Sequence, residues 1–123
     1  MNVIPMQKKG ANFVFSQGQV DCPKDWPNLP DGPYKIGVRP HHLMLSQSKQ
    51  TSLKIEAPVS TTEIAGSETF IHLSQGDLKL VVLTHGVHRV DIGDQIPIYI
   101  DPAKFFIFDG QDVLVSAPKV GAA

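Results

Sequence analysis

Histidine is the residue type in this sequence that could most readily bind a metal ion or transfer a proton. The chain has five of them, which are His41, His42, His72, His85 and His88. The last two form an HxxH pair and the first two are adjacent, but a zinc site needs three or four converging ligands, usually with help from cysteine or carboxylate. On a helix an HxxH pair would point to one side, whereas Gly86 and the strand-like surroundings break that geometry. We therefore expect histidines at turns and rims, and no metal site.

Nucleophilic catalysis needs a serine or cysteine beside an orienting base and an oxyanion hole. The residues after Ser67 lack the x-Gly of a nucleophile elbow, and Cys22 lies in a proline-rich stretch. Asp91 and Asp94 flank Gly93, which is typical of a turn. There is also no GxxxxGK[ST] loop to hold phosphates. The sequence thus predicts no catalytic residue, no cofactor and no enzymatic activity of this chain by itself.

Length and composition limit the class of protein. The chain has 123 residues, 41% of them hydrophobic, which fits one domain with a core. A net charge of −1 argues against nucleic-acid binding, which relies on clustered lysine and arginine, and the single Cys22 excludes an internal disulfide. No apolar run reaches the roughly 20 residues of a membrane span, and Gln7, Lys8 and Lys9 fall where a signal peptide needs an apolar stretch. We expect a cytoplasmic protein without direct membrane insertion.

Ten glycines and ten prolines favour many short strands over long helices. Residues 53–60 alternate between apolar and polar side chains, which is the pattern of a strand with one wet face, and Ile96, Ile98 and Ile100 repeat it. The expected strands are 11–15, 17–21, 34–38, 53–60, 69–73, 78–84, 96–100, 105–108 and 113–115, with a further short apolar segment at 2–6. Their spacing predicts an all-β domain, either a sandwich or a small barrel.

Proline and glycine also mark the connections. Residues 22–33 hold four prolines, so a loop is expected there. Trp26 within this loop either caps one end of the core or contacts a partner. The segment Asp101-Pro102-Ala103 predicts one helical turn, with aspartate as N-cap and proline in the first helical position. The chain is accordingly divided into N-terminal strands and proline-rich loop (1–33), a core barrel (34–116) and a frayed tail (117–123).

An ordered series of short segments resembles a known family. Gly37-Val38-Arg39-Pro40-His41-His42-Leu43 resembles the G-[IV]-R-P-E-[HD]-L element that opens the TOBE region of sugar-importer ABC ATPases of the MalK/UgpC type. Segments 64–69, 90–94 and 101–109 resemble the family's xxGxET, VxxGDxV and DPxR-x-H-x-FD elements, and 1–5 its MNxxP segment. His41 stands where the family usually has glutamate, and Phe106 where it often has histidine. The resulting candidates for family-motif or interface residues are Arg39, Pro40, Gly66, Glu68, Gly93, Asp101, Pro102, Phe106 and Phe108.

The resemblance implies a small OB-like β-barrel of short antiparallel strands. It also implies a C-terminal regulatory and dimer-supporting domain of the ATP-binding subunit of an importer for sugars or related solutes. The partners would be a second copy of the subunit, an N-terminal ATPase domain and, indirectly, the permease subunits, at the inner face of the cell membrane. Because this chain lacks the ATPase motifs, no ATP hydrolysis is implied for it alone.

Two other functions stay open. Related TOBE-type domains bind oxyanions, so a small-ligand module for an oxyanion or a sugar is one alternative. The other is an OB-type oligonucleotide binder, which needs a basic strand face with exposed aromatic residues. Lys54 and Lys79 are the only cationic residues clearly within the central strands, so the composition disfavours this second alternative.

Two features are candidates for contacts with a partner. Arg39 either anchors the loop that follows or bridges to another subunit by fork-like hydrogen bonds, or it is a solvated arginine at a strand end. The run 105–108 is apolar on both faces. It is therefore either a strand covered on both sides or an exposed patch used for association.

Overall fold

The structure, a computed structural model, describes residues 1–21, 29–47, 53–86 and 89–118. These residues form strands and two short 3-10 turns, and no α-helix, which confirms the all-β prediction. In chain order the elements are β1 (Asn2–Lys9), β2 (Asn12–Phe15), β3 (Gly18–Asp21), β4 (Gly32–Val38), η1 (Pro40–His42), β5 (Leu43–Met44), β6 (Leu53–Ala65), β7 (Glu68–Gln75), β8 (Leu78–His85), β9 (Gln95–Ile100), η2 (Pro102–Lys104), β10 (Phe106–Phe108) and β11 (Leu114–Ser116).

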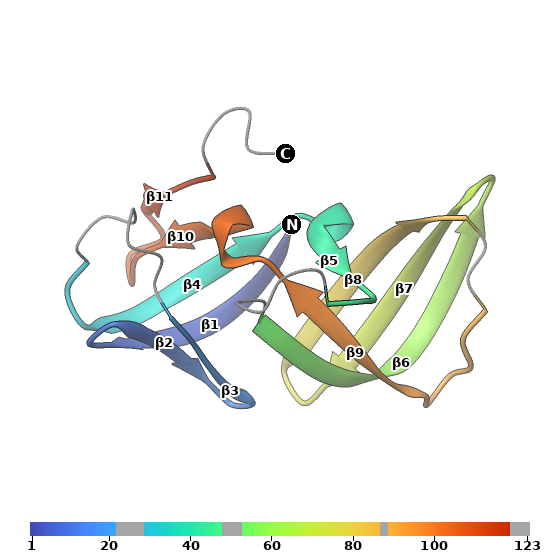
Figure 1. Cartoon of the computed structure of the whole chain (residues 1–123), viewed down its shortest axis with the longest axis horizontal. Helices are drawn as coiled ribbons and strands as arrows, with labels where there is room; N and C mark the ends of the chain where they lie inside the picture. Colours follow the sequence, from blue (N-terminus) through green and yellow to red (C-terminus); the bar gives the residue numbers. More distant parts are fainter. Residues whose placement is uncertain (22–28, 48–52, 87–88, 119–123) are drawn as a thin grey trace.

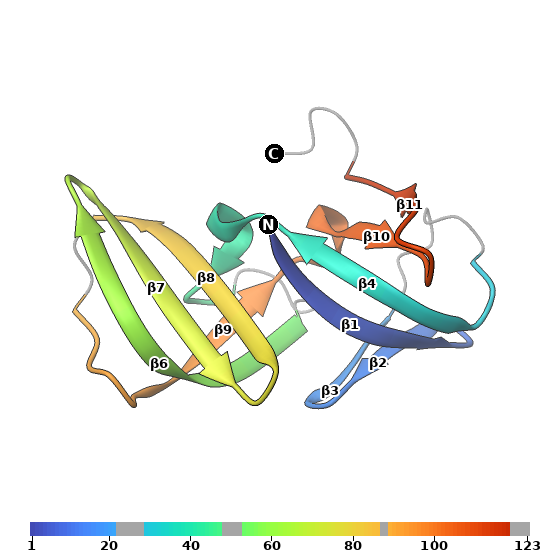
Figure 2. The same cartoon turned by 180° about the vertical axis from the view of Figure 1, so that it is seen from behind.

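The strands form two antiparallel sheets that lie side by side (Figures 1 and 2). One has six strands in the order β11-β10-β4-β1-β2-β3, and the other has five in the order β5-β9-β6-β7-β8. The five-stranded sheet curls until β8 meets η1 and β5, which makes it a nearly closed barrel. Its long strand β6 pairs first with β9 and then with β7, and a bulge between Val59 and Thr61 marks the change of partner. The predicted OB-like barrel is confirmed.

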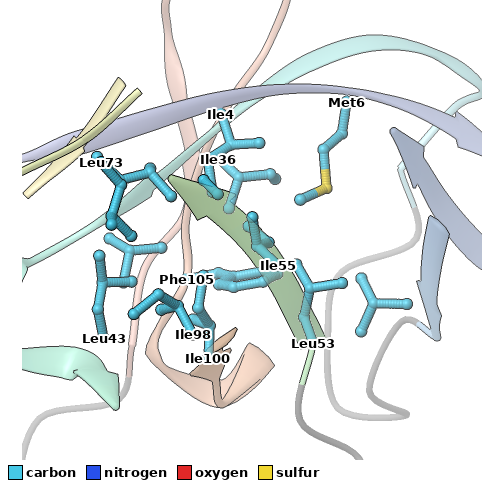
Figure 3. Close-up of a cluster of buried hydrophobic side chains, with 14 of the residues drawn as sticks. Ile4, Met6, Ile36, Leu43, Leu53, Ile55, Leu73, Ile98, Ile100 and Phe105 are labelled. Carbon is cyan, nitrogen blue, oxygen red and sulfur yellow. The ribbon is translucent and has the colours of Figure 1, made fainter. Parts of the chain in front are cut away.

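A single apolar core fills the space between the sheets (Figure 3). In β1 every second side chain is buried, so Ile4 and Met6 point inward from the six-stranded sheet, where Ile36 joins them from β4. Ile55 and Ile98 of the barrel meet them from the other side. The period-two pattern of the sequence therefore identifies the core face of each of these strands.

Several element boundaries differ from the prediction. Gly32 and Pro33 open β4 instead of closing the loop, because a proline is tolerated at the start of a strand. The sequence suggested a division between N-terminal strands (1–33) and a core barrel (34–116). Because β4 pairs with β1, residues on both sides of this boundary belong to the same six-stranded sheet. Strand β6 continues past Ser60 to Ala65, although no side chain in this part is buried, because its backbone pairs with β7.

The C-terminal hairpin also differs in detail. Phe105 is the C-cap of η2 and precedes β10, so the predicted strand at 105–108 begins one residue later, at Phe106. Strand β11 runs to Ser116, which pairs with Ile107, so it lies one residue later than the predicted strand at 113–115. Cys22 and Trp26 lie outside the described residues, so the two alternatives for Trp26 stay predictions.

Two side-chain amides connect the sheets by imitating a paired strand. The Asn2 Nδ2 group donates to Val81 O at 2.8 Å, and Val81 N donates back to Asn2 Oδ1 at 2.7 Å. Asn2 is only 6% exposed, so this pair satisfies polar groups that water barely reaches. The side chain thus completes the free edge of β8.

The second amide connection joins the β2–β3 turn to the barrel. Gln17 Nε2 donates to Glu56 O at 2.7 Å, and Glu56 N donates to Gln17 Oε1 at 2.8 Å. The N–H and C=O of one strand residue point to the same side, so both Glu56 groups point away from its β9 partner, Pro97. Pro97 is tolerated opposite Glu56 because this is a position of the β6–β9 pair at which the two residues exchange no backbone hydrogen bond.

We expect Asn2→Ala to lower the free energy of unfolding by about 1–3 kcal/mol, because it leaves both buried-edge groups of Val81 without partners. Gln17→Ala should cost less, about 0.5–1.5 kcal/mol, since water can replace an exposed amide. Urea unfolding monitored by circular dichroism measures both. Gln19→Ala, on the β2–β3 hairpin that carries Gln17, is the matched control. An Asn2→Ala variant as stable as this control would contradict the role assigned to the Asn2–Val81 hydrogen bonds.

Candidate functional site at the crossover between the sheets

The two 3-10 turns are the places where the chain passes from one sheet to the other. Turn η1 joins β4 to β5, and η2 joins β9 to β10. Leu43 in β5 pairs with Ile100 in β9, while Gly37 in β4 pairs with Phe106 in β10. The two connections must therefore run side by side in opposite directions, and Figures 1 and 2 show both near the N-terminus. We call residues 39–43 and 101–105 together the crossover.

The second turn of the crossover is closed as the sequence predicts. Asp101 Oδ1 accepts a hydrogen bond from Ala103 N at 3.0 Å, which caps the turn. Pro102 occupies the first position and is buried, and the amide of Phe105 donates to Pro102 O at 3.1 Å. Phe105 is 2% exposed and packs in the core, so its side chain anchors the C-terminal end of this turn. Asp101 and Pro102 thus shape the backbone.

The first turn has no side-chain cap, and its N-terminal residue makes a different contact. The Arg39 guanidinium lies over the ring of Phe106, with its Cζ atom 5.2 Å from the ring centroid. Pro40 takes the first position, and His42 N donates to Arg39 O at 2.9 Å. Arg39 is exposed, so its N–H groups stay open to solvent while the aromatic face limits its rotamers.

A glycine lets the side chains beside this contact approach the sheet closely. A Cβ at Gly37 would lie 3.0 Å from Met1 Sδ and 3.2 Å from Phe108 Cε2, which is too near for any larger residue without a shift. Phe106 faces the same glycine across the β4–β10 ladder. The glycine of the GVRPHHL segment thus leaves room for the Met1 and Phe108 side chains, which a larger residue would displace.

The histidine pair lies on η1, where the charges of Arg39 and Lys104 act on His42. The rings of His41 and His42 have centroids 4.1 Å apart and are tilted by 54°. Nδ1 of His42 is buried and has no hydrogen-bond partner. Burial, and after it the charges of His41, Lys104 and Arg39, lower the pKa of His42 below its ordinary value near 6.5. The ring is therefore neutral at neutral pH.

The remaining candidate residues lie away from the crossover, at the turns of the barrel. Gly66 (φ +64°) turns β6 into β7, and Gly93 (φ +95°) donates its amide to Val59 O at 2.8 Å. Glu68 starts β7, where it pairs with Ala65 and with His85. Positive φ is the reason for glycine at the two turn positions.

Sequence reasoning missed Asn2 and Gln17 as connecting residues. Nothing near them in the sequence marks the bonds, since the partners are 79 and 39 residues away.

The described part of the chain shows no group of three or more histidine, cysteine or carboxylate residues positioned to hold a metal ion. Among the same residues, no helix is both long enough and apolar enough to span a membrane.

Two shallow hollows exist elsewhere in the described part of the chain. One, of about 420 Å³, lies over β1 and β4, and the other, of about 480 Å³, lies between β1 and the turns that carry Gln17 and Gly76. Each borders Pro5 and is open to solvent.

The family follows from comparison with known proteins. A family model described as the TOBE domain matches residues 36–108, from the β4 strand to the end of β10. The chain belongs to the TOBE family. The match includes both turns of the crossover and the segments at 37–43, 64–69 and 90–94 that the sequence resemblance rested on, while the segment at 1–5 lies outside it.

Similar proteins are ATP-binding subunits of importers. The TOBE domain is 30% identical over 89% of its length to the sulfoquinovosyl glycerol transport ATP-binding protein SmoE of Agrobacterium fabrum. It is 26% identical over 89% of its length to the sn-glycerol-3-phosphate import ATP-binding protein UgpC of Psychromonas ingrahamii. It is 34% identical over 59% of its length to the maltose/maltodextrin import ATP-binding protein MalK of Mannheimia succiniciproducens. The matches cover 31%, 30% and 20% of those proteins, in their C-terminal parts.

Because the pKa of His42 is lowered in the folded state, acid should destabilise the TOBE domain. Below about pH 6.5 the unfolded chain takes up a proton at this ring that the folded chain does not, so the free energy of unfolding should fall as pH drops from 7.5 to below 6. His42→Gln should flatten this slope, as measured by urea unfolding at several pH values. His72→Gln, on β7, is the control, and an unchanged slope in His42→Gln would contradict the assignment.

Proposed function

We propose that this TOBE domain is a C-terminal regulatory and dimer-supporting domain of the ATP-binding subunit of an ABC importer for sugars or related solutes. The observation that supports it is alignment of 89% of the chain with the C-terminal parts of two such subunits. The solutes in their printed names, sulfoquinovosyl glycerol and sn-glycerol-3-phosphate, are both substituted polyols or sugar derivatives. ATP hydrolysis belongs, in this proposal, to an ATPase domain in the remaining two thirds of such a subunit.

The proposal places the domain on the cytoplasmic side of the membrane. Its partners there are the ATPase domain of its own subunit, a second copy of the subunit and, through the ATPase domain, the permease subunits. The domain itself contributes surfaces and no reactive group. Neither a cofactor nor ATPase activity is expected of this chain alone.

The surface that we assign to association with a second copy is the outer face of the six-stranded sheet. Val3, 47% exposed, and Leu114, 49% exposed, lie on it, and between them are the half-buried Phe106 and Phe108 and the exposed Pro5. The ladders place Gly37 between Val3 and Phe106, and these three residues form an apolar row across the face. In the parallel row, Lys35 lies between Pro5 and Phe108, and Leu114 follows Phe108. Exposed apolar faces of this kind are typical of protein–protein contacts.

Self-association should therefore be measurable on the isolated chain. Sedimentation equilibrium is expected to show a concentration-dependent rise toward the dimer mass, and Val3→Glu should abolish it by placing a charge in the apolar row. Ile92→Glu is the control, because Ile92 is 75% exposed and lies in the loop before β9. A strict monomer at every concentration would contradict the assigned contact.

A chimaera tests the transporter role. In UgpC of Psychromonas ingrahamii, the region that aligns with this chain would be replaced by it. The chimaera is expected to retain subunit pairing and solute-stimulated ATP hydrolysis, while a UgpC truncated before that region should lose pairing. A folded chimaera that behaves like the truncated protein would overturn the proposal.

A further inference from the structure

The larger of the two hollows, of about 480 Å³, lies where the tips of two hairpins from different sheets meet. The β2–β3 hairpin turns at Ser16 and Gln17, and the β7–β8 hairpin turns at Gly76 and Asp77. Figures 1 and 2 show both tips side by side at the bottom of the molecule. The volume is within the range of about 300–1,000 Å³ that small-molecule sites occupy. We call this space the hairpin hollow.

One part of its lining is apolar. It consists of Ile4 and Pro5 of β1, Phe15 at the end of β2 and Leu78 at the start of β8. Ile4 is 1% exposed, and Phe15 and Leu78 are half-buried and pack against the core. Because the packed core holds these side chains, the surface keeps its shape without a ligand. It can cover the C–H groups of a bound molecule.

Another part of the lining is polar and has a fixed hydrogen-bond direction. The backbone of Glu56 orients the Gln17 amide, since its N–H donates to Gln17 Oε1 and its C=O accepts from Gln17 Nε2. The second N–H of Gln17 Nε2 is donated to Gln75 Oε1 at 3.1 Å. The Gln75 carbonyl is thereby occupied, whereas its Nε2 group has no partner among the described residues. Gln75 therefore offers the hairpin hollow a donor.

Two further polar side chains line the hairpin hollow, one from each turn. The Asp77 carboxylate and the Ser16 hydroxyl are both exposed, and neither is bonded to another described residue. A carboxylate only accepts hydrogen bonds, an amide N–H only donates them, and a hydroxyl does both. No lysine, arginine or histidine is among the described residues that line the space. The lining thus asks a ligand for donors and acceptors together, and it offers no positive charge to an anion.

We propose that the hairpin hollow is a binding site for a neutral polyhydroxylated small molecule, which is a sugar or a polyol. Its hydroxyl groups accept from Gln75 and donate to Asp77, and its C–H groups pack on the apolar part of the lining. An ammonium group cannot accept from Gln75, and an anionic group is repelled by Asp77. The inference rests on the lining of this space and does not depend on the transporter role.

Nuclear magnetic resonance titration of the full 123-residue chain tests the site. The uncharged probes are glycerol, glucose, galactose and maltose, and the charged ones are glucose 6-phosphate and glucosamine in its ammonium form. We expect at least one uncharged probe to cause saturable shifts of the amides of residues 15–18 and 75–78, with an apparent Kd of about 1–10 mM for so open a site.

Two outcomes of this titration would overturn the proposal. One is a set of shifts that stay linear with all the uncharged probes up to about 0.1 M, well above the expected Kd. The other is a charged probe that binds more tightly than every uncharged one. Saturation with maltose alone would assign a site for a disaccharide, and saturation with glucose, galactose or glycerol a site for a smaller ligand.

Variants separate a specific site from general effects of sugars on the solvent. Gln75→Ala removes the donor and should weaken the apparent affinity about three- to tenfold, the factor expected for one neutral hydrogen bond. Asp77→Ala should weaken it about tenfold or more, since its hydrogen bond is to a charged group. It should also narrow the difference between the uncharged probes and glucose 6-phosphate, because the repelling charge is gone.

Gln19→Ala and Asp21→Ala are the matched controls, because both residues lie on β3 outside the lining. They should leave the affinity unchanged, and the amide spectrum of each variant reports whether it is folded. Folded Gln75→Ala and Asp77→Ala variants that bind as tightly as these controls would refute the site.

Discussion

The inner face of the six-stranded sheet packs directly on the curled five-stranded sheet, through fully buried side chains such as Ile36 and Ile55. Within the described residues, the buried side chains of both sheets form one core cluster, so each sheet depends on the other for burial of its core face. A chain that builds both sheets must cross between them, and it does so at η1 and η2. The second crossing is capped by the core residue Phe105, which gives η2 a rigid base.

Joining two sheets at an angle leaves strand edges without partners, and exposed edges invite pairing with other chains. This fold fills two such places with carboxamides. The Asn2 amide completes the edge at Val81, and the Gln17 amide completes the edge at Glu56. Each amide supplies one donor and one acceptor in the order that a strand residue would, so the sheets are joined by hydrogen bonds as well as by the core.

Two surfaces of different character meet at the contact of Arg39 with Phe106. On one side lies the apolar row of the outer face, suited to a flat protein partner. On the other lies the cationic crossover, where like charges would repel a second copy placed directly over it. The association proposed for the outer face can therefore be tested by substitutions that leave the crossover unchanged.

The sequence by itself determined the strands and their core faces, because period-two alternation is a local property that survives in any all-β arrangement. It also determined the Asp101-Pro102 turn, which rests on bonds between residues two and three apart. The start of β4 and the end of β6 could not be predicted from the sequence. The proline and polar residues there belong to strands only because a neighbouring strand pairs with them. The same holds for β5, whose two residues form a strand only against β9.

The candidate site shows the same division. Local motifs pointed to Arg39 and Asp101 separately, and the family resemblance added Phe106. Only the tertiary structure placed η1 beside η2, seated the guanidinium on the aromatic ring and left His42 Nδ1 buried without a partner. The physical reason is that charge and packing act through space, between segments that chain order keeps far apart. The meeting of the two turns at the crossover arose from the pairing of β5 with β9 and of β4 with β10, which no local pattern announces.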